Sequence, residues 1–227
     1  MRRAALSPLR LAFALSGLLP LAGLAARPVD TQALVWTGFV AVVLPAPAPR
    51  ISARRFLLAA IATGMAVELA AWAGHYAACS PEPALFHPQL GRDLLIGVGF
   101  YSGLGLTWAW LVRRFGFSVG ECFAVNGAMG VFLEQQGAAF LAGLQALPEG
   151  ALLWVFVFLI YGPMAAIPRR LAIPAGTAAP PRRPWHYPVA ALAASAGAFA
   201  GTYAFGLVLM ALGLLPEPRS ICAAPFW

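Results

Sequence analysis

The fold of this chain is constrained most strongly by one apolar run with a carboxylate near its middle. Residues 56–78 read FLLAAIATGMAVELAAWAGHYAA and include Glu68. As a helix, this run is long enough to cross a hydrocarbon core about 30 Å thick. Residues that recur at steps of three or four share one face of a helix, and here they are Gly64, Glu68, Trp72, His75 and Cys79. Since an acid at membrane depth rarely faces lipid, we predict that this face points into a helix bundle.

The rest of the chain has the same apolar character. Its 227 residues are 61% hydrophobic and only 10% charged, whereas a soluble domain carries about 25% charged residues. The apolar runs predict an all-α polytopic transmembrane bundle of seven spans in one membrane domain, approximately 11–26, 33–48, 56–78, 94–112, 119–144, 150–167 and 188–215. If the first run is instead a cleaved signal peptide, six spans remain.

Arginine placement predicts the orientation of these spans. Every one of the 15 basic residues is arginine. Twelve lie on the side of the N-terminus: Arg2, Arg3, Arg10, Arg50, Arg54, Arg55, Arg113, Arg114, Arg169, Arg170, Arg182 and Arg183. Only Arg27, Arg92 and Arg219 lie on the other side. Because cytoplasmic loops are enriched in basic residues, we expect a cytoplasmic N-terminus and an outer C-terminus. A composition rich in Ala, Gly and Arg is typical of a GC-rich bacterium. We therefore expect the protein to lie in a bacterial inner membrane.

The composition also excludes one cofactor and argues against one class of partner. The chain has no lysine, so a retinal Schiff base is excluded. The net charge of +7 does not indicate nucleic acid, because the arginines flank apolar runs. The expected partners are the lipid bilayer and either other membrane subunits or further copies of this chain.

Two membrane acids are the candidates for chemistry. Glu68 and Glu134 have no arginine at comparable depth, and burial favours the neutral form of a carboxyl group. One interpretation is a proton or cation relay; the other is a protonated glutamate that joins helices through a hydrogen bond. Asn126 shares a helix face with Glu134, and Gln135 follows it, so we include both in the candidate relay. If the span 119–144 neighbours 56–78, the two glutamates could line one site.

A second group lies near the outer surface. His75, Cys79, His87 and Asp93 offer ligand types suited to zinc or copper, although their spacing matches no compact metal motif. Cys79 and Cys222 are both predicted outside, where a disulfide can form. The metal site and the disulfide compete for Cys79.

These features support three functions in order. The first is a small membrane transporter or permease component, coupled to protons or cations through the buried glutamates. The second is an accessory or assembly subunit whose polar residues mediate helix contacts; the glycine pairs Gly99 and Gly103, and Gly197 and Gly201, suit close helix packing. The third is a membrane enzyme or metal site at the outer face, which the short loops make the least expected.

Overall fold

The computed structural model describes residues 52–172, 183–215 and 217–227, and these residues form helices without any strand. Four of the described helices are long and apolar enough to cross a membrane: α3 (Ala53–Ala77), α4 (Leu90–Phe115), α7 (Gly150–Ala172) and α8 (His186–Ala211). The predicted all-α, membrane-embedded class therefore holds for the described residues. The predicted spans 11–26 and 33–48 lie outside these residues, so the total of seven stays a prediction.

The span predicted at 119–144 is not one helix. It divides into α5 (Val119–Leu133), the short 3-10 helix η1 (Glu134–Gly137) and α6 (Ala138–Gln145). Gln135 and Gln136 have φ values of 50° and 59°, which lie in the left-handed region. A right-handed helix cannot continue through that conformation, and residues other than glycine adopt it at a cost. The segment predicted as the span 119–144 is therefore divided at this point.

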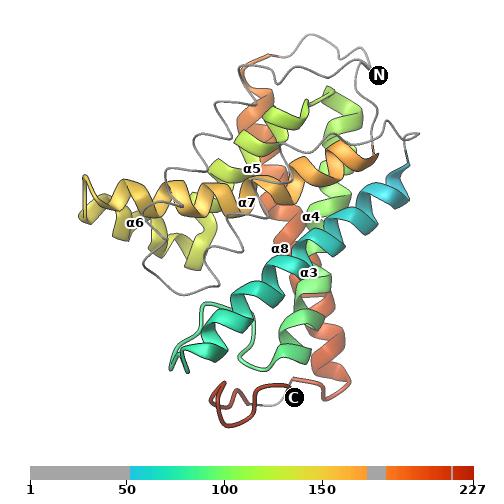
Figure 1. The fold of residues 1–227 in the computed structure, drawn as a ribbon. Coiled ribbons are helices and arrows are strands. Elements are labelled where there is room, and N and C mark those ends of the chain that lie inside the picture. The colour runs from blue at the N-terminus through green and yellow to red at the C-terminus, as the bar shows by residue number, and fades with distance from the viewer. Residues whose placement is uncertain (1–51, 173–182, 216) are drawn as a thin grey trace, which may run out of the picture.

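The long helices pack in two pairs that α3 joins. α4 packs along α8, α5 packs along α7, and α3 contacts both α4 and α7 (Figure 1). Gly103 of α4 lies against the carbonyl of Gly197 in α8, and Gly99 lies near the backbone of Gly201. A side chain at these positions would meet backbone and push the two helices apart. The close packing predicted for these glycines is thus what holds α4 against α8.

α5 begins with a capping box, and Glu121 of that box also connects α5 to α8. The Ser118 side chain accepts a hydrogen bond from the Glu121 backbone, and Glu121 in return accepts one from the Ser118 backbone, so the helix's first turn is satisfied. The hydroxyl of Tyr187, in the first turn of α8, also donates to Glu121 at 2.8 Å. Glu121 therefore has a structural role at this end of the bundle.

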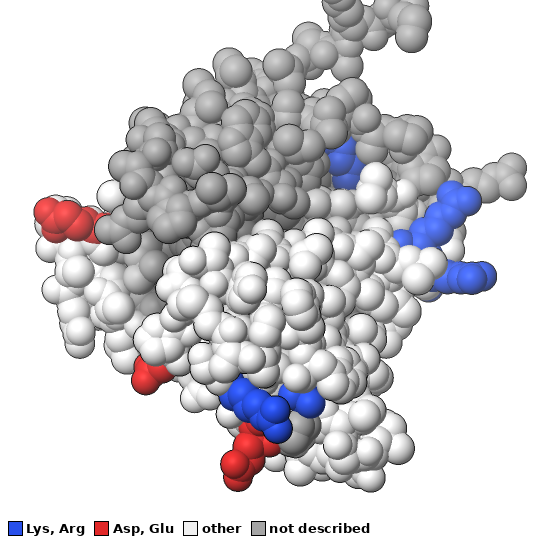
Figure 2. All heavy atoms as spheres, turned by 60° about the horizontal axis from the view of Figure 1, so that its bottom comes forward, with Lys and Arg blue, Asp and Glu red and all other residues white. Residues whose placement is uncertain are grey.

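Large apolar side chains cover much of the surface. Those most exposed among the described residues include Tyr203 at 75%, together with Leu152, Leu192, Phe199 and Met210. Figure 2 shows a broad face without charged side chains, with acidic and basic groups gathered toward its margins. Soluble monomers rarely expose so much contiguous apolar surface, whereas a lipid-facing surface requires it.

Candidate functional site

Glu68 of α3 forms a close pair with Tyr101 of α4. The Tyr101 hydroxyl donates a hydrogen bond to Oε1 of Glu68 at 2.5 Å. The tyrosine ring lies directly over Gly64, one helical turn before the glutamate, where a Cβ atom would overlap the ring. The absence of a side chain at Gly64 thus lets the pair form.

Glu134 forms an equivalent pair with Tyr161 of α7. The Tyr161 hydroxyl donates to Oε2 of Glu134 at 2.7 Å. Its ring covers Gly130, where an added Cβ atom would again overlap the tyrosine. The carboxyl group belongs to the first residue of η1, where α5 has just ended. This second pair therefore lies at the break in the chain.

The two pairs are copies of one arrangement. In each, a glycine precedes the glutamate by four residues, and a tyrosine from a later helix packs on the glycine and bonds to the glutamate. The likeness does not form a repeat in the sequence, because the tyrosines stand at different separations from the glutamates, 33 and 27 residues. The duplication becomes visible only when the helices are packed.

The pairs are close enough to act together. Glu68 and Glu134 lie near enough to each other for a negative charge on one to act on the other. The helix between them is α7, which packs against both α3 and α5. The two glutamates therefore contribute to one cluster, although α5 packs mainly on α7 and not on α3. We call Glu68, Tyr101, Glu134 and Tyr161 the carboxyl–tyrosine cluster.

The other two candidate relay residues have different positions. Asn126 is fully buried, accepts a hydrogen bond from the Trp108 indole at 2.8 Å and donates to the carbonyl of Tyr161 at 2.6 Å. It therefore bridges α4, α5 and α7 and helps to position Tyr161. Gln135 is an exposed residue of the left-handed turn. Its conformation contributes to the break that holds Glu134.

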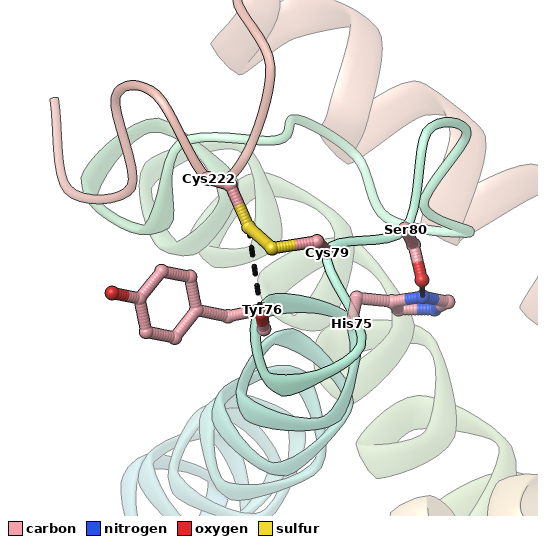
Figure 3. Close-up of a disulfide and its surroundings, with 5 residues drawn as sticks. All are labelled: His75, Tyr76, Cys79, Ser80 and Cys222. Carbon is pink, nitrogen blue, oxygen red and sulfur yellow. Dashed lines mark hydrogen bonds between the residues drawn. A yellow bond between two sulfur atoms is a disulfide. The ribbon is translucent and has the colours of Figure 1, made fainter.

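Two of the outer candidate residues have partners of other kinds. Cys79 and Cys222 form a disulfide with a Cα–Cα distance of 5.5 Å, which is one of the two alternatives that the sequence left open for Cys79. The His75 ring lies 3.0 Å from the Ser80 hydroxyl through Nδ1. Figure 3 shows the imidazole pointing to Ser80 while the disulfide lies on the other side of the chain.

The remaining two outer residues, His87 and Asp93, lie at the start of α4. Asp93 is fully buried and accepts a hydrogen bond from the backbone of His87 at 3.0 Å, while the His87 ring accepts one from the backbone of Gln89. Nowhere in the described part of the chain do three or more His, Cys, Asp or Glu side chains gather as a metal site. The structure therefore does not assemble the four predicted ligands. Asp93 instead lies near enough to Glu68 for its negative charge to act on that residue, a proximity that sequence reasoning missed.

This arrangement suits the storage and exchange of a proton or a small cation. A carboxyl group can carry a proton or a negative charge, and a phenol hydroxyl can donate to it in either state. Both glutamates are half-buried. Interrupted helices also free backbone groups, and in membrane proteins such breaks line cavities or binding sites. The chain matches no protein-family model, no curated protein and no solved structure.

Proposed function

We propose that this protein is a small membrane transporter or permease component whose coupling groups are Glu68 and Glu134. The observation that carries the proposal is the Glu–Tyr pair, which occurs twice, with one copy at a helix break. Acids at membrane depth are expensive to keep and commonly belong to ion or proton pathways. Plain helix packing does not require two acids whose charges interact.

The cluster works by exchanging a proton for a cation. When a glutamate is protonated, it is neutral and keeps its hydrogen bond from tyrosine. When it loses the proton, its charge attracts a cation, and the tyrosine hydroxyl continues to donate to it. Because two nearby carboxylates repel each other, the cluster favours states in which a proton or a bound cation neutralises at least one glutamate. Each exchange thereby changes the charge that the surrounding helices enclose.

The contacts of the two glutamates also bear on the accessory-subunit alternative. Glu68 and Glu134 both bond to tyrosines of the same chain. A subunit that used these acids to recruit another membrane protein would direct them outward instead. The intrachain bonds therefore favour transport over assembly as their role.

For the location, we propose a bacterial inner membrane with the arginine-rich ends in the cytoplasm. Supporting arginines stand at the start of α3, at the ends of α4 and α7, and before α8: Arg54, Arg55, Arg113, Arg114, Arg169, Arg170 and Arg183. In this orientation α3 and α8 run outward and α4 and α7 run inward, which places all these arginines on the cytoplasmic side. On this orientation the disulfide lies on the oxidising side of the membrane.

The test uses the proton itself as the probe, because no solute is assumed. The protein is reconstituted in liposomes on a solid-supported membrane, and the charge movement after a rapid pH step is recorded. We expect the wild type to give a transient current that Glu68→Gln and Glu134→Gln each reduce by about tenfold or more. The matched control is Glu149→Gln, an exposed acid between α6 and α7, which should leave the current unchanged.

Two outcomes would count against this function. A wild-type current that persists in both glutamine variants would show that the cluster does not bind the translocated proton. A wild type that gives no current, together with a stoichiometric partner chain in native mass spectrometry, would favour the accessory subunit. If the current is present, the same preparation can be screened with inorganic cations, amines and sugars to find the solute.

A further inference from the structure

The C-terminal residues 217–227, which we call the strap, cross the outer ends of α3 and α4. Cys222 joins the strap to Cys79, just beyond the end of α3, through the disulfide. Figure 3 shows this bond, together with a contact from Cys222 to the carbonyl of Tyr76. A short tail that would otherwise fray is thereby fixed to the helix bundle at one point.

A buried glutamine holds the strap at a second point. Gln89 is fully buried, and its amide nitrogen donates to the carbonyls of Arg219 and Ala224 at 2.9 Å each. Its amide oxygen accepts a hydrogen bond from the backbone of Arg219 at 3.4 Å. The three hydrogen bonds occupy both ends of one side-chain amide, so Gln89 grips the strap on either side of Cys222. Sequence reasoning did not identify this residue.

The strap also completes the start of α4. The first backbone N–H groups of a helix need acceptors from outside the helix, and the N-cap residue of α4 supplies none from its side chain. Here the N–H groups of Leu90 and Gly91 donate to the carbonyls of Pro225 and Phe226, both at 3.0 Å. The Trp227 ring then covers Gly91. The first turn of α4 therefore depends on the strap.

The strap reaches the outer neighbours of the carboxyl–tyrosine cluster. Phe226 packs against Trp72, with ring centroids 5.7 Å apart, and Trp72 lies one helical turn from Glu68 in α3. Asp93, whose charge interacts with Glu68, lies in the first turn of α4 that the strap completes. A change in the strap would thus alter both helices beside Glu68.

The disulfide that holds the strap is accessible to thiols in solution. Cys79 and Cys222 are both exposed, and Cys79 has φ of 46°, a left-handed conformation that is strained for a residue with a side chain. Exposed disulfides are the ones most readily attacked by thiolates. We propose that Cys79–Cys222 is a site of thiol–disulfide exchange with a dithiol reductant, and that this exchange locks and releases the strap.

The exchange balances in two steps. One thiolate of the reductant attacks Sγ of Cys222, forms a mixed disulfide and expels the Cys79 thiolate, which takes up a proton. The second thiol of the reductant loses its proton and attacks the reductant's other sulfur, which is bonded to Cys222 in the mixed disulfide. This attack expels the Cys222 thiolate, which takes up a proton. The reductant has then become a disulfide, and two electrons and two protons have passed to the two cysteines. The reduced strap keeps its hydrogen bonds and its aromatic contacts but loses its covalent link, and the first turn of α4 loosens with it.

The proposal stands apart from the transport function, because its test measures backbone protection and no flux. Hydrogen exchange of the full chain in mild detergent is followed by mass spectrometry before and after treatment with dithiothreitol. We expect exchange in residues 86–93 and 217–227 to become about tenfold faster or more on reduction, and to slow again on reoxidation. Cys79→Ser with Cys222→Ser should exchange rapidly from the start and ignore dithiothreitol.

The control is Cys122→Ser, which removes the buried free cysteine of α5 and should keep the full response. Two results would overturn the proposal. In one, the folded wild type keeps its disulfide in millimolar dithiothreitol. In the other, the disulfide is reduced but residues 86–93 and 217–227 stay as protected as before, which would make the bond a fixed structural link. The wild-type comparison decides the question even if the double variant fails to fold.

Discussion

Alanine at Gly64 or at Gly130 should disrupt one Glu–Tyr pair while leaving every polar group of the cluster in place. A Cβ atom at Gly64 would overlap the Tyr101 ring, and one at Gly130 would overlap the Tyr161 ring. Both glycines lie in regular helix, so alanine meets no backbone penalty there. The ring has to move away, and its hydroxyl moves away from the glutamate.

The size of the effect follows from three contributions. Loss of the Tyr–Glu hydrogen bond costs about 1 kcal/mol, and the overpacked methyl group costs about 2 kcal/mol. Alanine in place of a helical glycine returns about 1 kcal/mol through helix propensity. Each substitution should therefore lower the free energy of unfolding by about 2 kcal/mol.

The assay is equilibrium unfolding in mixed micelles of mild detergent and dodecyl sulfate, followed by tryptophan fluorescence. Gly206→Ala is the matched control, because nothing lies within 4 Å of a Cβ atom at that helical position of α8. It should be as stable as the wild type or up to about 1 kcal/mol more stable. If Gly64→Ala and Gly130→Ala unfold like Gly206→Ala, the tyrosines do not pack on these glycines as described.

Three further substitutions test neighbouring features in the same unfolding assay. Asn126→Leu removes both hydrogen bonds of a buried amide and should cost about 2 kcal/mol; an unchanged stability would show that Asn126 is no bridge. Gln135→Gly relieves a left-handed residue and should stabilise the protein by about 1 kcal/mol, whereas destabilisation would argue against the break. Gly103→Ala forces a methyl group against the Gly197 carbonyl and should cost about 1–3 kcal/mol, unlike Gly206→Ala.

The sequence reveals the helices and the acids, but not what the acids contact. Apolar length and a polar face are local properties, so the run around Glu68 could be recognised directly. Tyr101 and Tyr161 could not be singled out, because a tyrosine in an apolar helix is usual in a core or near an interface. Their role depends on which helices are neighbours, and the sequence of a single chain does not contain that information.

The break at Gln135 and Gln136 escaped prediction for a different reason. Left-handed residues are usually glycine or asparagine, and only Gly137 follows this rule in the turn. A continuous apolar run with polar residues near its centre is therefore interpreted as one helix. For Asp93 the error has another origin. Its carboxylate suggested a metal ligand, whereas its position in the first turn of α4 brings its charge near Glu68.

The central claim is that Glu68 and Glu134 belong to one interacting cluster. Infrared spectroscopy of the reconstituted protein can follow the carboxylic C=O bands during a pH titration, with the Glu68 band assigned from Glu68→Gln. We predict that Glu134→Gln moves the midpoint of the Glu68 band, because the two carboxyl groups lie near enough for a charge on one to act on the other, while Glu149→Gln leaves it in place. A Glu68 midpoint that is the same in the wild type and in Glu134→Gln would contradict the account.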